Sequence, residues 1–329
     1  MFIEDRVLPS ASKTLLFSAI MAAITTVTMA QPATPNQYQF INILTAGTGG
    51  VFYPLGEALS NIFAAQIPGI KPSVQSTKGS VENLKLLQQG RGEIAFTQGD
   101  ALAFAWAGNA DAGFRSKIDK VRSITAIYPS YIHIMALKQS GIKTIVDLKG
   151  KRLSVGARNS GTELDARKIL GAAGINYKDL GKAVYLPFEE SVDLMKNNEL
   201  DATLQVGGLG IPAIREIANA FPVFFVEVPP EIVAKAGVPY AAGIIPKDTY
   251  KGQDTDVRTV KLLNYIVARA DLQAGVVYDM TKAIFDSTGE LVAAHAAAAA
   301  IKLGGALDGN PVPLHPGAEK FFKEKGLIQ

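Results

Sequence analysis

The sequence contains no cysteine, one tryptophan and three histidines in 329 residues. The lack of cysteine excludes disulfides, thiolate metal sites and a cysteine nucleophile. Neither sign of charge is in large excess, because 33 Lys and Arg stand against 30 Asp and Glu, a net charge of +3. A chain this balanced has no broad basic field, so we expect no nucleic-acid partner. After residue 30 no apolar run reaches the ~18 to 20 residues of a membrane span.

The first 30 residues are typical of a secretory signal peptide. Arg6 and Lys13 precede an apolar run at 14–27 that is too short to cross a bilayer, and polar residues follow Ala30. We therefore expect residues 1–30 to be removed and the mature chain to be released outside the inner membrane. A buried or interfacial N-terminal helix is the alternative. Because no cysteine stands at the cut, no lipid anchor is expected there.

From residue 39 onward, short β-branched runs alternate with amphipathic stretches, which predicts an α/β protein. The length exceeds what one hydrophobic core usually organises, so we expect two lobes, each an open sheet flanked by helices. The first part of lobe 1 is expected over 31–129, lobe 2 over 130–238, and the return to lobe 1 with C-terminal helices over 239–329. Most of 258–306 is expected to be helical. Strands are predicted at 39–44, 71–76, 93–97, 131–137, 152–155, 183–186, 202–206, 223–226 and 241–245.

Several loops that directly follow predicted strands are rich in glycine and hydroxyl side chains. Residues 45–50 read TAGTGG and precede a helix, so their N–H groups lie where an anion is stabilised. Phe52 stands where a dinucleotide fingerprint would need a third glycine. Because the carboxyl ends of strands form the ligand edge of open α/β sheets, we expect an inter-lobe cleft that closes around a small anion. Tight turns for packing are the alternative. The corresponding loops are 75–80, 97–100, 156–162 and 206–210.

The sequence offers little for catalysis. It has no His-Glu-x-x-His and no Gly-x-Ser-x-Gly motif, and the histidines at 133, 295 and 315 are far apart in the chain. Asp100 could hold a ligand ammonium or cap its own helix, and Tyr53 and Tyr128 could close over a ligand. We therefore expect no enzyme, no cofactor and no metal site.

Seven segments resemble the TAXI family of solute-binding proteins, over essentially the whole mature chain. The resemblance implies a periplasmic receptor with the two-lobed type II periplasmic-binding fold, its ligand cleft lying between two open sheets. It further implies membrane partner subunits of a tripartite ATP-independent periplasmic (TRAP) transporter, driven by an ion gradient. Ligands of that family include glutamate, glutamine and 2-oxoglutarate-like acids. The segments are TAGTGGVFYPLGEALS (45–60), QSTKGSVENLKLLQQG (75–90), IAFTQGDA (94–101), IYPSYIHI (127–134), VGARNSGTELDARKIL (155–170), VGGLGIPAIREIA (206–218) and PVPLHPGAEKFFKEKGL (311–327).

The resemblance also implies a set of ligand-binding residues, carried over by position. Two departures from the family pattern, Lys78 and Arg158, add cations beside cleft loops. They favour a ligand more anionic than a neutral amino acid, a dicarboxylate or 2-oxo acid, with Arg158 on one carboxylate. The alternative is that both side chains point to solvent. Besides these two, the set is Thr48, Gly49, Gly50, Tyr53, Thr77, Gly79, Ser80, Gln98, Asp100, Tyr128, Ser160, Gly161, Thr162 and Gly208.

Two other functions remain open at this point. A sensory receptor would use the same cleft and dock on a signalling membrane protein. An enzyme on the same scaffold would need a positioned base or nucleophile. We expect a monomer, since a receptor that docks through both lobes is most simply one.

Overall fold

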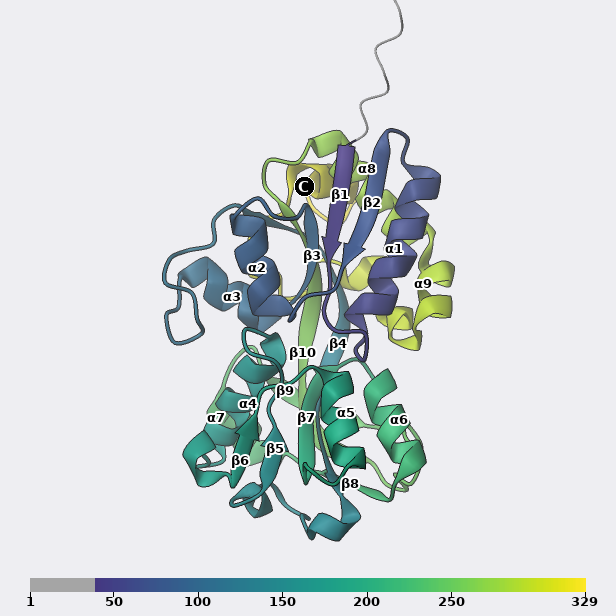
Figure 1. The fold of residues 1–329 in the computed structure, drawn as a ribbon. Coiled ribbons are helices and arrows are strands. Elements are labelled where there is room, and N and C mark those ends of the chain that lie inside the picture. The colour runs from purple at the N-terminus through teal and green to yellow at the C-terminus, as the bar shows by residue number, and fades with distance from the viewer. Residues whose placement is uncertain (1–38) are drawn as a thin grey trace, which may run out of the picture. The chain divides into compact units, whose positions relative to one another are not determined.

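The computed structural model describes residues 39–329, which lie in one compact unit, Tyr38–Gln329. The predicted signal peptide lies outside the described residues. Two lobes are joined by two long antiparallel strands that run through both, β4 (Val121–Leu137) and β10 (Val257–Arg269) (Figure 1). Pro129 of β4 pairs with Leu263 of β10 near the middle of both strands. The passage between lobes therefore lies inside continuous strands.

Lobe 1 has a parallel sheet in which β1 (Gln39–Leu44) lies between β2 (Ile70–Gln75) and β3 (Ile94–Gln98). The second half of β10 adds an antiparallel strand beside β3. Helices α1, α8 and α9 lie on one side of this sheet and α2 and α3 on the other (Figure 1). The helices of lobe 1 are α1 (Phe52–Gln66), α2 (Ser80–Gln88), α3 (Gly99–Ala107), α8 (Ala274–Asp286), α9 (Thr288–Ala294) and α10 (Pro316–Glu324).

Lobe 2 repeats the plan, with β5 (Arg152–Ser154) between β6 (Lys182–Val184) and β7 (Ala202–Gly207), all parallel. The second half of β4 pairs with β7 and with β8 (Val223–Val226), and β9 (Ala241–Ile245) pairs with the first half of β10. Helices α4 and α7 cover one side and α5 and α6 the other (Figure 1). These helices are α4 (Gly161–Ala172), α5 (Phe188–Lys196), α6 (Pro212–Ala220) and α7 (Pro230–Ala236).

Hydrophobic spacing explains the individual elements. In α1 the buried side chains Leu55, Leu59, Ile62 and Phe63 recur every three or four residues, so one face of the helix packs on the sheet. Every residue of β7 is buried because helices cover both faces of its sheet. The strands predicted at 39–44, 223–226 and 241–245 have those same bounds.

The helical prediction for the start of 258–306 is wrong, because β10 occupies Val257–Arg269. Its first half has two buried residues, Thr259 and Val260, between exposed Arg258 and Lys261, and its second half is nearly all buried. Such a continuous apolar run has no period that separates strand from helix. Strand β4 likewise starts at Val121, ahead of the predicted 131. Since β9 pairs with Val257–Lys261, the chain re-enters lobe 1 within β10, later than residue 239.

None of the helices in residues 39–329 is long and apolar enough to cross a membrane.

Candidate ligand-binding site

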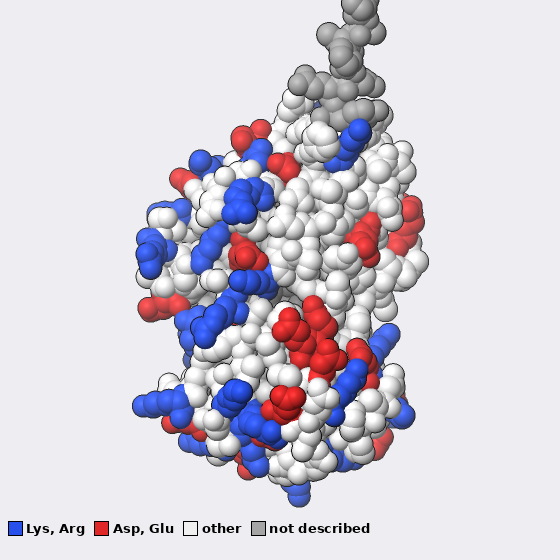
Figure 2. Space-filling view, in the orientation of Figure 1, with Lys and Arg blue, Asp and Glu red and all other residues white. Residues whose placement is uncertain are grey.

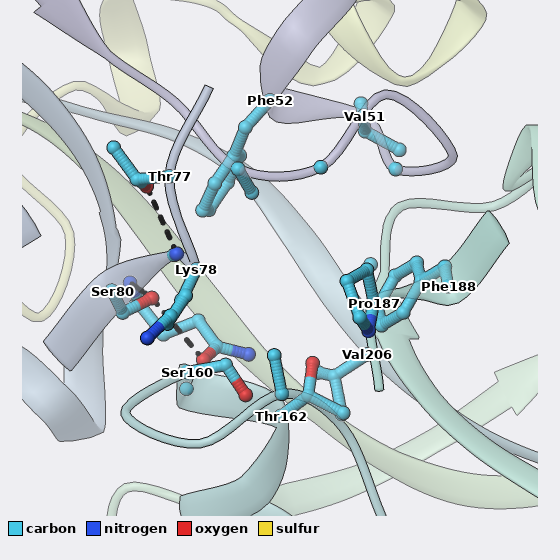
Figure 3. A pocket seen from close by; sticks show the side chains of 18 of the residues that line it. Val51, Phe52, Thr77, Lys78, Ser80, Ser160, Thr162, Pro187, Phe188 and Val206 are labelled. Atoms are coloured by element: carbon cyan, nitrogen blue, oxygen red, sulfur yellow. Dashed lines mark hydrogen bonds between the residues drawn. The ribbon is translucent and has the colours of Figure 1, made fainter. Parts of the chain in front are cut away.

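A pocket opens between the two lobes where the strand ends of both face each other. Its cavity volume is about 60 Å³. Figure 3 shows side chains from both lobes converging on it. The lining residues are Ala46, Gly47, Gly50, Val51, Phe52, Thr77, Lys78, Gly79, Ser80, Gln98, Tyr128, Ala157, Ser160, Gly161, Thr162, Pro187, Phe188, Val206 and Gly207.

The loop between β1 and α1 lies against a carboxylate of lobe 2. Gly49 N–H donates to Glu189 Oε2 at 3.3 Å. A Cβ on Gly47 would lie 2.9 Å from Glu189 Oε1, so a side chain at Gly47 would force the carboxylate to move. On the same loop, Gly49 O accepts from Ala213 N–H at 3.2 Å. Glycine at 47 thus lets this loop approach the Glu189 carboxylate closely.

The loop between β2 and α2 is held by buried hydrogen bonds within lobe 1. Asn83 Nδ2 donates to Thr45 O at 2.7 Å and to Phe96 O at 2.9 Å. The Thr77 hydroxyl lies 2.6 Å from Asn83 Oδ1 and accepts from Gly79 N–H at 3.0 Å. Gly79 has φ of 106°, a conformation that side chains disfavour. This loop places Lys78 beside the pocket (Figure 3).

Gln98, at the end of β3, reaches from lobe 1 to lobe 2. Its backbone N–H donates to Ser80 Oγ at 3.1 Å, and its side-chain Nε2 donates to Asp165 Oδ2 of α4 at 2.8 Å. A Cβ on Gly161 would lie only 1.4 Å from Gln98 Oε1. The first residue of α4 is therefore covered directly by the Gln98 amide, and only glycine fits there.

Behind Gln98 lies a buried carboxyl pair that also joins the lobes. The Tyr240 hydroxyl lies 2.8 Å from Asp100 Oδ2 and 3.0 Å from Asp165 Oδ1, and both aspartates are fully buried. A hydroxyl has one hydrogen, so it donates to one carboxyl and the other must donate to it. Burial raises the pKa of Asp100, and burial together with the Asp100 charge raises the pKa of Asp165 well above its usual range.

No described basic side chain neutralises this pair. The hydrogen-bond partners of its carboxyl oxygens are Tyr240 and Gln98, and Asp100 Oδ1 has no partner within the described residues. The other charged side chains on α4 and α7 are Glu163, which is half-buried, and Arg167, Lys168, Glu231 and Lys235, which are exposed at the surface. The pair therefore holds at least one proton when the lobes are closed, since two bare carboxylates there would repel each other.

The loop before α4 is shaped by its cap and by contacts with lobe 1. Ser160 Oγ accepts from Glu163 N–H at 3.0 Å and caps the helix. Asn159, with φ of 64°, accepts from Glu82 N–H at 3.0 Å through its carbonyl and from Lys85 Nζ at 3.2 Å through its side chain. Gly161 and Thr162, the first two residues of α4, line the pocket.

Some of the predicted site residues lie in the lining and others do not. Those in the lining are Gly50, Thr77, Lys78, Gly79, Ser80, Gln98, Tyr128, Ser160, Gly161 and Thr162. Those elsewhere are Thr48, Gly49, Tyr53, Asp100, Arg158 and Gly208.

Three of the residues outside the lining have other contacts. The Arg158 guanidinium stacks on the Tyr185 ring, 3.7 Å from its centroid, and is exposed. Asp100 belongs to the buried carboxyl pair. Gly208 lies behind the pocket, where a Cβ would be 3.1 Å from the Tyr128 ring.

The other three lie on the loop and helix that follow β1. Thr48 is exposed, Gly49 binds Glu189, and Tyr53 lies beside Glu57, which raises the Tyr53 pKa.

The sequence reasoning overlooked the apolar part of the lining. Pro187 and Phe188 follow β6, so the rule that ligands bind at strand carboxyl ends would have found them. Val51 directly precedes α1 and Phe52 begins it, and Val206 is the last residue but one of β7. The Phe52 ring stacks on Phe96 with centroids 5.2 Å apart.

The histidines make local structural contacts. His133 Nδ1 lies 2.9 Å from Tyr131 O, and burial lowers its pKa to about 4, so the ring is neutral. Its Nε2 accepts from the Tyr250 hydroxyl at 3.0 Å, and that hydroxyl accepts from Gly210 N–H at 3.0 Å. His315 Nδ1 accepts from Gly317 N–H and caps α10. Within residues 39–329, no group of three or more His, Asp or Glu side chains could hold a metal.

Comparison with known proteins identifies a family and a fold. The sequence profile of the NMT1-like family matches residues 43–326. The chain is similar to the alkanesulfonate-binding protein SsuA of Xanthomonas axonopodis pv. citri bound to MOPS, at 14% identity and a TM-score of 0.52, over 92% of this chain and 96% of that chain. A periplasmic transporter structure aligns at 12% identity and a TM-score of 0.54, over 87% and 92%.

A third similar structure is a binding protein component of an ABC phosphonate transporter from Pseudomonas aeruginosa. It aligns at 12% identity and a TM-score of 0.51, over 79% of each chain. At these identities the likeness concerns the fold alone. It confirms the predicted two-lobed α/β fold of periplasmic binding proteins.

Proposed function

The chain belongs to the NMT1-like family, and from that premise we propose that it is a periplasmic receptor that captures a small carboxylate and delivers it to a membrane transporter. The observation that carries the proposal is the pocket lined by both lobes at their strand ends. Lys78 and the N-termini of α2 and α4 border it, and both kinds of group stabilise an anion. Closure of the lobes then buries the solute.

The groups in the lining suit binding of a solute that is released unchanged. The described lining residues supply hydroxyls, one side-chain amide and one ammonium, with no histidine or carboxylate to act as a general base. Two proteins of similar fold are described as binding an alkanesulfonate or serving phosphonate transport, and both solutes are anions. A small organic acid is the corresponding solute here.

For the transporter, the resemblance of the sequence to the TAXI family favours a TRAP system. An ABC transporter is the second candidate, because one protein of similar fold serves an ABC system. Uptake of labelled ligand by spheroplasts of the source organism, supplied with purified protein, separates the two. Collapsing the ion gradient with an ionophore stops TRAP uptake, whereas depleting ATP while holding the gradient stops ABC uptake.

Binding itself is tested by calorimetry on Lys78→Ala. Loss of a charge-assisted contact worth about 1.5 to 3 kcal/mol should lower the affinity for the acid roughly tenfold to a hundredfold. Lys247→Ala is the matched control, since Lys247 is exposed in the segment between β9 and β10 and does not line the pocket. Equal affinities of the two variants would remove Lys78 from the site, and no binding of any organic acid would overturn the receptor proposal.

A further inference from the structure

The two sides of the pocket differ in chemistry (Figure 3). Lys78, Ser80 and Ser160 lie on one side, and the apolar side chains of Val51, Pro187 and Phe188 lie on the other. Building on the proposed function, we propose that the site selects an acid with one anionic head and an apolar end. Glu189 is the residue that excludes a second anionic group.

The polar side is built for one head group. Among the described lining residues, Lys78 alone carries a charge. Beside it stand the first turns of α2, at Ser80, and of α4, at Gly161 and Thr162, whose N–H groups have no carbonyl partner within their helices. Ser160 Oγ, whose acceptor role serves Glu163 N–H, keeps its own hydrogen for donation. One carboxylate uses these donors together.

The apolar part of the lining forms a wall with side chains from both lobes. Phe52 stacks on Phe96 and meets the Tyr128 ring edge-on at 6.4 Å between centroids, so its position is set by packing. Phe188 and Val206 extend the wall from lobe 2. A carboxylate placed there would lose its water without gaining charged partners, which is costly. An alkyl or aryl group placed there gains from burial.

Glu189 adds repulsion at this end of the pocket. Glu189 does not itself line the pocket, but its carboxylate oxygens lie 2.9 and 3.0 Å from the Cβ position of Gly47, which does, and it follows Phe188 directly in α5. Figure 2 shows acidic side chains gathered over α5 at the junction of the lobes, and basic ones across the junction over α2 and α4. A second carboxylate on the solute would therefore meet like charge.

The cation that could have held a second carboxylate points elsewhere. Arg158 stacks on Tyr185 and is absent from the lining. The expectation that Arg158 makes the ligand a dicarboxylate thus has no support in the geometry of the pocket. With Lys78 on one side and Glu189 on the other, the charges fit a single anionic head.

The test compares six-carbon acids that differ only at the far end: hexanoate with adipate, 2-oxohexanoate with 2-oxoadipate, and norleucine with 2-aminoadipate. In whichever pair binds, calorimetry on the refolded protein should show that the monoacid has at least about tenfold higher affinity than the diacid. The reason is that like charge at close range costs several kcal/mol. Equal or tighter binding of the diacid overturns the selectivity and leaves the receptor function standing. No binding of any acid in the set overturns the selectivity, and no binding of any organic acid overturns the receptor function as well.

A variant then assigns the exclusion to Glu189. Glu189→Gln keeps an oxygen for Gly49 N–H and removes the charge, so the diacid should gain about tenfold in affinity while the monoacid changes less than about twofold. Glu190→Gln, an exposed neighbour on the same helix, is the control and should leave the ratio unchanged. An unchanged ratio in Glu189→Gln would show that Glu189 does not select the solute.

Discussion

The β2–α2 loop of lobe 1 is held by bonds within its own lobe, whereas the loop before α4 in lobe 2 depends on lobe 1 for much of its support. In lobe 1, Asn83 ties together three segments that end at the pocket. In lobe 2, Asn159 is held by α2, and Gly161 lies under the Gln98 amide. The β2–α2 loop, which carries Lys78, thus keeps its support when the lobes separate, and we expect lobe 2 to complete the site when it closes.

We expect Gly161→Ala to have the largest effect on solute binding, because it disturbs the contact between the two lobes. The added Cβ would lie 1.4 Å from Gln98 Oε1, so the amide must leave Asp165 and Ser80 or the lobes must stay apart. Loss of two buried hydrogen bonds of about 1 to 3 kcal/mol each should lower the affinity for the solute about a hundredfold or more, as measured by calorimetry.

Gly171→Ala on the same helix is the control, because nothing lies within 4 Å of the added atom. Thermal unfolding of the unliganded Gly161→Ala protein should stay near that of this control if each lobe folds on its own contacts. Unchanged affinity in Gly161→Ala would contradict closure of α4 onto Gln98.

The buried carboxyl pair of Asp100 and Asp165 makes closure of the two lobes depend on pH. In the closed form the pKa values of Asp100 and Asp165 are raised, so this form binds a proton that separated, solvated carboxyls give up. Raised carboxyl pKa values favour closure at low pH, and the preference is lost as pH rises toward the raised values. Affinity should therefore fall with rising pH by up to about tenfold per unit above the usual carboxyl pKa. Titrations between pH 5 and pH 8 measure this slope.

Asp165→Asn supplies the matched control for the pH effect. The amide can accept from Gln98 and donate to Tyr240 without an added proton, so the pH slope should flatten while binding persists. A slope that is the same in Asp165→Asn and in the unaltered protein would show that other groups, or the solute itself, carry the pH dependence.

The smallest effect is expected at Arg158, on the lobe 2 loop. Because its guanidinium stacks on Tyr185 outside the lining, Arg158→Ala should change affinity by less than about twofold and stability by about 0.5 to 1 kcal/mol. Calorimetry and thermal unfolding check both values. A tenfold loss of affinity for a diacid in Arg158→Ala would show that Arg158 contributes to ligand binding.

The architecture was largely readable from the sequence because most strands are short, β-branched runs bounded by turn residues. Strand β10 was not readable, because its second half is buried on both faces and loses the alternation that identifies a strand. The rule of strand carboxyl ends located the loops of both lobes. It could not say that Arg158 turns toward Tyr185 or that Asp100 turns toward Asp165, because side-chain direction depends on packing between elements far apart in the chain.

The most direct measurement of the central claim, that both lobes close on one acid, is calorimetric titration of the refolded protein with six-carbon acids. The account predicts one acid per chain, with binding strongly weakened by Lys78→Ala in lobe 1 and by Gly161→Ala in lobe 2. It also predicts retained binding in Lys247→Ala and Gly171→Ala. Saturable binding of an acid with the same affinity in Gly161→Ala as in the unaltered protein would contradict the account. So would the absence of binding of any acid.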